Sequence, residues 1–185
     1  MKVAITGTIG SGKSEMSNYL RNKYGLFVFD CDKTNSETLE NNPLLLKKDF
    51  SDCFDGDLLN KRKLADVIFN DISQRKRLES IMHPLILKEM FKDEKSHNPF
   101  YAEVPLLFES GWDKYFDLKV LVVSDEKIAL ERLKARGLSE KESKIRIKNQ
   151  MSINDKMAKS DVIIYNNLNL ASFYKEIDDW ITNVR

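Results

Sequence analysis

Five short apolar runs alternate with longer segments of helical periodicity along the chain. The runs are KVAIT (2–6), LFVF (26–29), YAEVPLL (101–107), LKVLVV (118–123) and DVIIYN (161–166). Several are apolar at nearly every position, which is typical of parallel strands covered by helices on both faces. The periodic segments span residues 13–23, 61–70, 75–95, 126–136, 139–151 and 170–182. This alternation predicts a three-layer α/β/α sandwich.

The segment between the second and third runs, residues 33–99, is mostly helical in pattern and interrupts the first half of the predicted sheet. No internal repeat, low-complexity tract or Pro/Gly-rich linker divides the chain. With 185 residues the chain is long enough for one hydrophobic core. We therefore predict a single domain over residues 1–185, in which residues 33–99 form a helical insert and residues 136–150 a movable lid.

Composition is that of a globular protein, with 42% hydrophobic and 32% charged residues. No apolar run approaches the ~20 residues of a membrane-spanning helix, and the first residues lack the pattern of a signal peptide. We expect a cytoplasmic monomer or weak homo-oligomer in which Cys31 and Cys53 are reduced. Near-neutral charge without basic–aromatic interleaving gives no reason to expect nucleic acid as a partner.

The net charge of +1 hides an uneven distribution. Residues 127–159 carry ten basic and four acidic side chains, so the rest of the chain is acidic. A basic segment of this kind suits an anionic ligand, although composition alone favours a solvated helix face.

Residues 7–14, GTIGSGKS, fit the phosphate-binding pattern G-x-x-x-x-G-K-[ST] in full. A strand-like run precedes them and a helical pattern follows, as this pattern requires. Glycines at Gly7, Gly10 and Gly12 permit a tight turn that aims successive N–H groups, including that of Ser11, at phosphate oxygens. The positive end of the following helix adds to the attraction.

Three residues that follow the last glycine are expected to complete a nucleotide site. Lys13 would reach the β- and γ-phosphates, Ser14 would hold Mg²⁺, and the amide of Glu15 would meet the α-phosphate. The alternative is a glycine turn with a chance lysine. The pattern does not identify the reaction, because GTPases, ATPases and kinases share it. The guanine-specific string N-K-x-D is missing, since its nearest match at residues 60–63 reads NKRK. The small size, helical insert and basic lid favour phosphate transfer to a small molecule.

Asp30 and Asp32 flank a cysteine at the end of the second predicted strand. Carboxylates two residues apart in a strand point to the same side, and parallel strands end at the ligand crevice. One of them can therefore take a proton from an acceptor hydroxyl. The alternative, left open by the sequence, is that Asp32 caps a helix starting near Lys33.

Five stretches occur in the same order in dephospho-CoA kinases. They are the glycine loop, FDCDKTNSE (29–37), HPLI (83–86), VPLLFE (104–109) and SDVIIYNN (160–167). The chain resembles that family over nearly its full length. The resemblance implies a P-loop kinase fold with a five-stranded parallel sheet, a helical CoA-binding insert and a lid. It also implies Mg²⁺-dependent transfer of the γ-phosphate of ATP to the ribose 3′-hydroxyl of dephospho-CoA, the last step of coenzyme A synthesis.

The resemblance implies roles around the acceptor. Asp32 matches the family's catalytic base, and Asp30 is a supporting carboxylate or merely a strand-end residue. His83, which precedes a proline, matches a residue of the substrate region, with a structural turn or helix start as the open alternative. Pro105 and Leu107 are expected to shape the wall against the pantetheine arm.

The resemblance also implies roles around the nucleotide. The family often has an acid at the position of Glu103, and a buried acid needs a partner, such as Lys13 or water on Mg²⁺. The alternative for Glu103 is a strand residue facing an edge. Asn166 matches an asparagine that lies near the adenine in this fold.

Arginines of the basic segment are candidates for phosphate binding. Arg136, at a helix end before a glycine, matches an arginine that closes over the ATP phosphates. Arg132 lies on the same helix face. Arg146 and Gln150 match an R-x-x-x-Q pattern of the family, and Arg146 is the second candidate after Arg136. A solvated basic face stays the alternative for each arginine.

Thr8 in the glycine loop and Glu15 directly after it depart from the family's pattern. Thr8 stands where glycine is usual, and a positive φ there would cost ~1 kcal/mol or more. Glu15 brings a negative charge close to the expected triphosphate. Neither removes a group that the chemistry needs. Two rivals for the function stay open: a nucleoside or nucleoside-monophosphate kinase on the same scaffold, and a nucleotide-binding switch without transfer activity.

Overall fold

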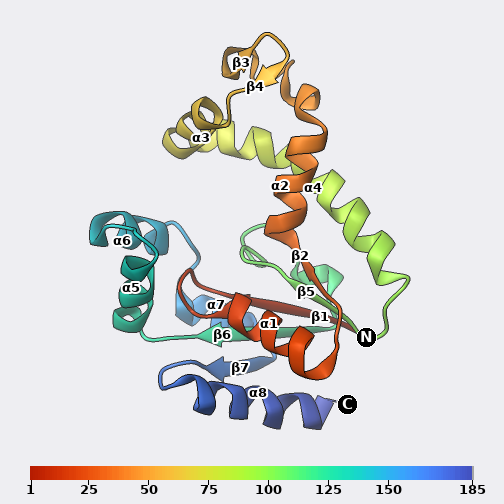
Figure 1. The fold of residues 1–185 in the computed structure, drawn as a ribbon, viewed down its shortest axis with the longest axis vertical. Coiled ribbons are helices and arrows are strands. Elements are labelled where there is room, and N and C mark those ends of the chain that lie inside the picture. Colours follow the sequence, from red (N-terminus) through yellow and green to blue (C-terminus); the bar gives the residue numbers. More distant parts are fainter. Residues whose placement is uncertain (185) are drawn as a thin grey trace. The chain divides into compact units, whose positions relative to one another are not determined.

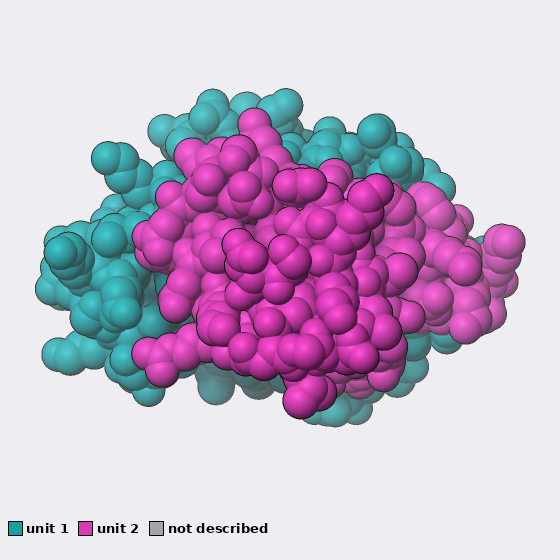
Figure 2. All heavy atoms as spheres, turned by 90° about the horizontal axis from the view of Figure 1, so that it is seen from above, with its two compact units in different colours: residues 1–30, 97–185 teal, residues 31–96 magenta. Residues whose placement is uncertain are grey.

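The computed structural model describes residues 1–184, and Figure 1 shows its helices and strands. The chain divides into two compact units, which Figure 2 colours separately. Unit 1 comprises Met1–Asp30 and His97–Arg185, and unit 2 comprises Cys31–Ser96. Among the residues described, no helix combines the length and the apolar character that crossing a membrane requires.

Unit 1 contains a five-stranded sheet in the order β2-β5-β1-β6-β7. The strands are β1 (Lys2–Gly7), β2 (Val28–Asp30), β5 (Phe100–Glu103), β6 (Leu118–Val123) and β7 (Val162–Tyr165). Every neighbouring pair is parallel, so the predicted five-stranded parallel sheet is confirmed. The third apolar run was predicted to be a strand as far as residue 107, and this is wrong. The strand ends at Glu103, because Pro105 has no N–H for the ladder, and the chain turns over residues 105–111.

Helices cover both faces of this sheet. Those of unit 1 are α1 (Lys13–Tyr24), α5 (Glu126–Ala135), α6 (Glu140–Lys148), α7 (Ile153–Lys159) and α8 (Leu170–Val184), with a short 3₁₀ turn, η3 (Asp113–Tyr115). On one face, Met16 of α1 and Phe173 of α8 belong to the same apolar core as Ile5 of β1. Residues that alternate with these, such as Ala4 and Leu121, are equally buried. The opposite face is therefore also shielded from water, and α7 contacts β6.

Unit 2 is mainly helical, as the periodicity of residues 33–99 indicates. It contains α2 (Cys31–Asn41), η1 (Pro43–Leu46), η2 (Ser51–Cys53), a small antiparallel hairpin of β3 (Phe54–Asp55) and β4 (Leu58–Leu59), α3 (Lys61–Asn70) and α4 (Ile72–Glu94). Side chains cap the two later helices. Asn60 accepts from the backbone N–H of Lys63 at 3.1 Å, and Asp71 accepts from that of Ser73 at 2.7 Å. Both α2 and α3 contact α4.

The structure corrects the predicted local conformations of Asp32 and His83. β2 ends at Asp30 and α2 begins at Cys31, so Asp32 is a helical residue and does not share a strand with Asp30. The capping alternative is also wrong, because Asp32 lies inside the first turn of α2. Likewise, Pro84 lies within α4, so His83 marks neither a turn nor a helix start.

Candidate active site

The glycine loop connects β1 to α1 and is packed closely from outside. Gly12 has a φ of 103°, in the region that favours glycine, and a Cβ there would lie 2.2 Å from Nδ2 of Asn166. At Gly10, with a φ of 81°, a Cβ would lie 2.9 Å from the carbonyl oxygen of Ala129 in α5. No non-glycine residue in the described part of the chain has a positive φ, so the strain considered for Thr8 does not arise.

Lys13 folds back over this loop. Its Nζ donates to the carbonyl oxygens of Gly7 at 2.9 Å and Thr8 at 3.1 Å, and the side chain is buried. The ammonium group thereby lies over the loop that leads into α1, whose N-terminus is the positive end of the helix dipole. A cation and a helix N-terminus in one place form a binding site for a highly charged anion.

Ser14 and Glu103 face each other where α1 begins and β5 ends. The hydroxyl of Ser14 donates to Oε1 of Glu103 at 2.8 Å, and Glu103 is 5% exposed. A hydroxyl and a carboxylate are hard oxygen ligands that suit Mg²⁺. Residues 1–184 contain no cluster of three or more His, Cys, Asp or Glu suited to a metal. The pair therefore fits a cation that takes its other ligands from water and phosphate.

Two adjacent strands end in carboxylates at this edge of the sheet. Asp30 of β2 lies opposite Glu103 of β5 in the parallel register. The pairing follows from the strand order, which places β5 between β2 and β1. Since parallel strands end at the ligand side of the sheet, both acids lie at the same edge as the glycine loop.

Arg132 and Asn166 hold the outer side of the loop. Nη1 of Arg132 donates to the carbonyls of Gly10 (3.3 Å) and Ser11 (3.2 Å), and Nη2 donates to Oδ1 of Asn166 at 2.9 Å. Nδ2 of Asn166 donates to the same Ser11 carbonyl at 2.9 Å. Burial and the nearby charge of Arg136 lower the pKa of Arg132, although an arginine stays protonated in proteins. Arg132 and Asn166 thus hold the carbonyls of the loop, while the N–H of Ser11 donates to the carbonyl of Thr8 at 3.2 Å.

The contact of Arg132 with the loop is not predicted by the sequence, in which Arg132 stands out only as a neighbour of Arg136 on one helix face. The one available signal was its position four residues before Arg136, one turn deeper into α5. Arg136 is the exposed C-cap residue of α5, and Arg146 is exposed in the last turn of α6. Within residues 1–184, neither donates a hydrogen bond to the glycine loop.

Other predicted residues take varied positions. Pro105 is partly exposed, whereas Leu107 is fully buried, so only Pro105 presents surface to a ligand. Asp32 is exposed in unit 2. His83 is partly buried in α4 of the same unit, where desolvation lowers its pKa.

Glu15 is turned toward the C-terminal helix. Its carboxylate accepts a hydrogen bond from the hydroxyl of Tyr174 in α8, and this bond raises the pKa of Tyr174. The ring of Tyr174 stacks on Tyr19 with centroids 4.0 Å apart. The acid that departs from the family pattern therefore has a partner within the protein, while its backbone N–H remains in the first turn of α1.

Comparisons with known proteins identify the family of the chain. The family model for dephospho-CoA kinase matches residues 1–172. A dephospho-CoA kinase of Helicobacter pylori is 35% identical over 187 residues, which cover 97% of this chain and 95% of the relative. A crystal structure from Thermus thermophilus has a TM-score of 0.90 at 30% identity, covering 100% of this chain and 98% of that chain. The dephospho-CoA kinase of Campylobacter jejuni has a TM-score of 0.74 at 27% identity, with the same coverage. The chain belongs to the dephospho-CoA kinase family, whose members are ATP-dependent phosphotransferases.

Proposed function

We propose that this chain transfers the γ-phosphate of ATP to the ribose 3′-hydroxyl of dephospho-CoA and releases ADP and coenzyme A. The observation that carries the proposal is the complete glycine loop with its buried Lys13, in a chain of this family. The rivals share the loop, but neither is favoured by a family match over residues 1–172.

Lys13 and backbone N–H groups of the loop bind the triphosphate in this proposal. The Lys13 ammonium neutralises charge on the β- and γ-phosphates as the phosphoryl group transfers. Gly7, Gly10, Ser11, Gly12 and the amides of Ser14 and Glu15 complete the cradle. Arg136 and Arg146 add positive charge when the lid, residues 136–150, closes over the nucleotide. Asn166 lies near the adenine.

Ser14 and Glu103 would hold Mg²⁺, with Glu103 acting mostly through water. Bound there, the ion supplies neutralisation of the phosphate oxygens. The fit rests on the 2.8 Å hydrogen bond that already brings the two oxygen ligands together.

Asp32 orients the 3′-hydroxyl and accepts its proton as the ribose oxygen attacks the γ-phosphorus and ADP leaves. His83, Pro105 and Leu107 belong to the acceptor site in this proposal, although the burial of Leu107 limits it to supporting the wall. The helical insert of residues 33–99 binds the CoA part of the substrate. The proposed function also places the protein in the cytoplasm.

The test is an ADP-release assay with ATP and Mg²⁺, in which dephospho-CoA, AMP, a nucleoside and water are compared as acceptors. We expect turnover with dephospho-CoA alone, a product with the mass of coenzyme A, and no turnover by Lys13→Ala. Preference for AMP or a nucleoside would replace the proposal with a different kinase. ATP binding without transfer to any acceptor would favour a switch.

A further inference from the structure

Lys156 of α7 is a fully buried cation with one carboxylate partner. Its Nζ lies 2.8 Å from Oε1 and 3.0 Å from Oε2 of Glu109, in the turn that follows β5. The Lys156 side chain is 0% exposed and that of Glu109 is 21% exposed. Burying an ion pair costs desolvation energy that the attraction repays only with good geometry, so such a pair adds little to stability. The phosphate-binding groups described above do not include either residue.

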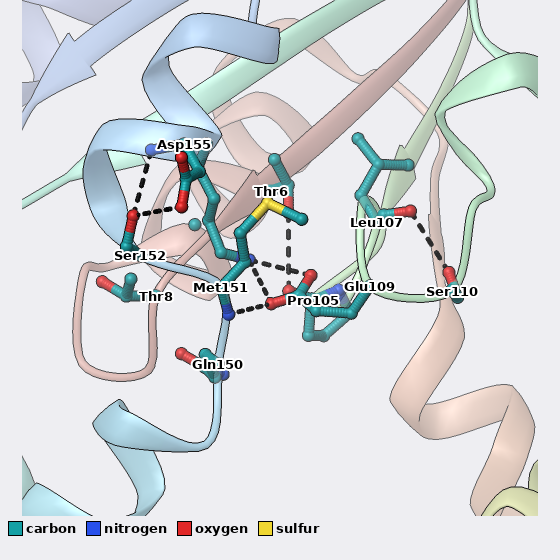
Figure 3. A network of polar contacts seen from close by, with 12 residues as sticks. Thr6, Thr8, Pro105, Leu107, Glu109, Ser110, Gln150, Met151, Ser152 and Asp155 are labelled. Atoms are coloured by element: carbon teal, nitrogen blue, oxygen red, sulfur yellow. Dashed lines mark hydrogen bonds and ion pairs between the residues drawn. The ribbon is translucent and has the colours of Figure 1, made fainter.

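Glu109 also fixes the backbone at the end of segment 136–150. Its Oε1 accepts from the N–H of Met151 at 2.9 Å. The preceding residue, Gln150, accepts from the N–H of Ile9 in the glycine loop at 2.9 Å through its Oε1. Figure 3 shows Met151 between Gln150 and Glu109, with the hydrogen bond from Met151 to Glu109 as a dashed line. One carboxylate thus joins α7, the end of segment 136–150 and, through Gln150, the loop.

The two ends of segment 136–150 differ in how tightly the backbone is held. At its start, Gly137 is exposed, has a φ of 87°, and has no atom within 4 Å of where a Cβ would lie. At its end, Gln150 and Met151 are bound on consecutive residues. A segment that closes over a ligand needs residues that absorb the backbone change and others that stay in place. Gly137 suits the first requirement, and residues 150–151 suit the second.

We propose that Glu109 and Lys156 are positioning residues for phosphate transfer, which anchor the end of segment 136–150 and connect it to the glycine loop through Gln150. The inference rests on the proposed function, in which this segment closes over ATP. Closure in register excludes water from the γ-phosphate. Loss of the anchor should therefore let water attack the γ-phosphorus, releasing ADP, inorganic phosphate and a proton, while the acceptor is left unmodified.

The first test compares the ADP released with the dephospho-CoA phosphorylated. We expect a ratio near one for the native protein, and an increase of about tenfold for Glu109→Met, which removes both acceptor oxygens, since misplacement by about 1 Å can cost as much as a hundredfold. Gln150→Leu, which removes the acceptor for Ile9, should act in the same way. Because both sites act through one connection, the double variant Glu109→Met/Gln150→Leu should be no worse than the worse single variant.

The second test needs no acceptor and uses amide hydrogen exchange. Glu109→Met should speed exchange at both Ile9 and Met151. Asp161→Asn serves as the matched control, because it breaks another ion pair of unit 1, the 2.9 Å contact with Lys119; its exchange at Ile9 and Met151 should be native. If Glu109→Met folds poorly, Glu109→Met/Lys156→Met removes both charges and avoids leaving a buried lysine unpaired. It should show the same rise in both amides.

Unchanged exchange at Ile9 with a native ADP ratio, in variants that are merely less stable to heat, would overturn the inference. So would additive effects of Glu109→Met and Gln150→Leu. Failure of the proposed function looks different: the native protein would transfer no phosphate to dephospho-CoA, while exchange at Ile9 and Met151 would still report on the anchor.

Discussion

Arg132 and Asn166 bind each other at 2.9 Å, and both donate to the carbonyl of Ser11 in the glycine loop. The two side chains come from α5 and from the end of β7, 34 residues apart in the chain. They bind carbonyls that would otherwise lack partners, and so fix the orientation of these peptide groups in the loop. The shape of the nucleotide site is therefore set partly by residues outside the loop.

Arg132→Met should weaken ATP binding and lower the melting temperature. A hydrogen bond to a charged group contributes about 1.5–3 kcal/mol, so we expect the ATP dissociation constant to rise by about tenfold or more. Calorimetric titration with ATP measures this. Arg136→Met is the matched control, since Arg136 is exposed at the helix end and its loss should leave the melting temperature native. Equal melting temperatures for both variants would contradict the role given to Arg132.

Asp32→Asn should lower kcat by about 10²-fold or more, because the amide cannot accept the proton of the 3′-hydroxyl. ATP binding should stay native, since Asp32 is not part of the loop. Steady-state kinetics with a separate measurement of ATP affinity distinguishes the two effects. A kcat close to native would reduce Asp32 to a first-turn residue that favours the dipole of α2.

Glu103→Gln should raise the Mg²⁺ concentration needed for half-maximal turnover by about tenfold, because the variant keeps the volume of the side chain and loses its charge. A titration of turnover with Mg²⁺ at fixed ATP measures the shift. Asp30→Asn removes the neighbouring carboxylate and should have the smaller effect, since the hydrogen bond to Ser14 is made by Glu103. The reverse order would move the metal site to β2.

His83→Gln should reduce the loss of stability in mild acid. Burial lowers the pKa of His83, and Glu79 opposes this by a smaller amount. Between that lowered pKa and about 6.5, the unfolded chain binds more protons than the folded protein. The stability present above pH 6.5 is therefore lost as the pH falls toward the lowered pKa. Thermal unfolding at pH 7 and pH 5 should show a smaller difference for the variant than for the native protein.

Elements with strong local signals could be predicted closely. The run LKVLVV corresponds residue for residue to β6, and the periodic segment 61–70 to α3. The end of β5 could not be predicted from apolar content, since residues 104–107 are as apolar as the strand itself. The strand ends because Pro105 has no N–H for the ladder. α7 was missed because seven mostly polar residues give no periodicity, and its start depends on the Ser152 cap.

Site residues could be predicted where a local sequence pattern specifies the backbone loop. They could not be predicted where they depend on side chains that are distant in the sequence. The eight-residue loop has a sequence pattern of its own, which led directly to Lys13 and Ser14. Arg132 donates its hydrogen bonds to backbone carbonyls, which every residue has, so no sequence pattern predicts these contacts. Glu15 and Tyr174 are 159 positions apart, and only the packing of α1 against α8 brings them together.

The strand order has a consequence for synthesis on the ribosome. β1 is the central strand and leaves the ribosome first, yet its partners are Phe100–Glu103 and Leu118–Val123. A nascent chain carrying only the first 96 residues has all of unit 2 but neither neighbour of β1. Sheet formation with such long sequence separation is slow, and an unpaired apolar strand is prone to aggregate. The segment KVAIT therefore lacks both of its sheet partners for more than half of translation and has both only after Leu118–Val123 have been synthesised.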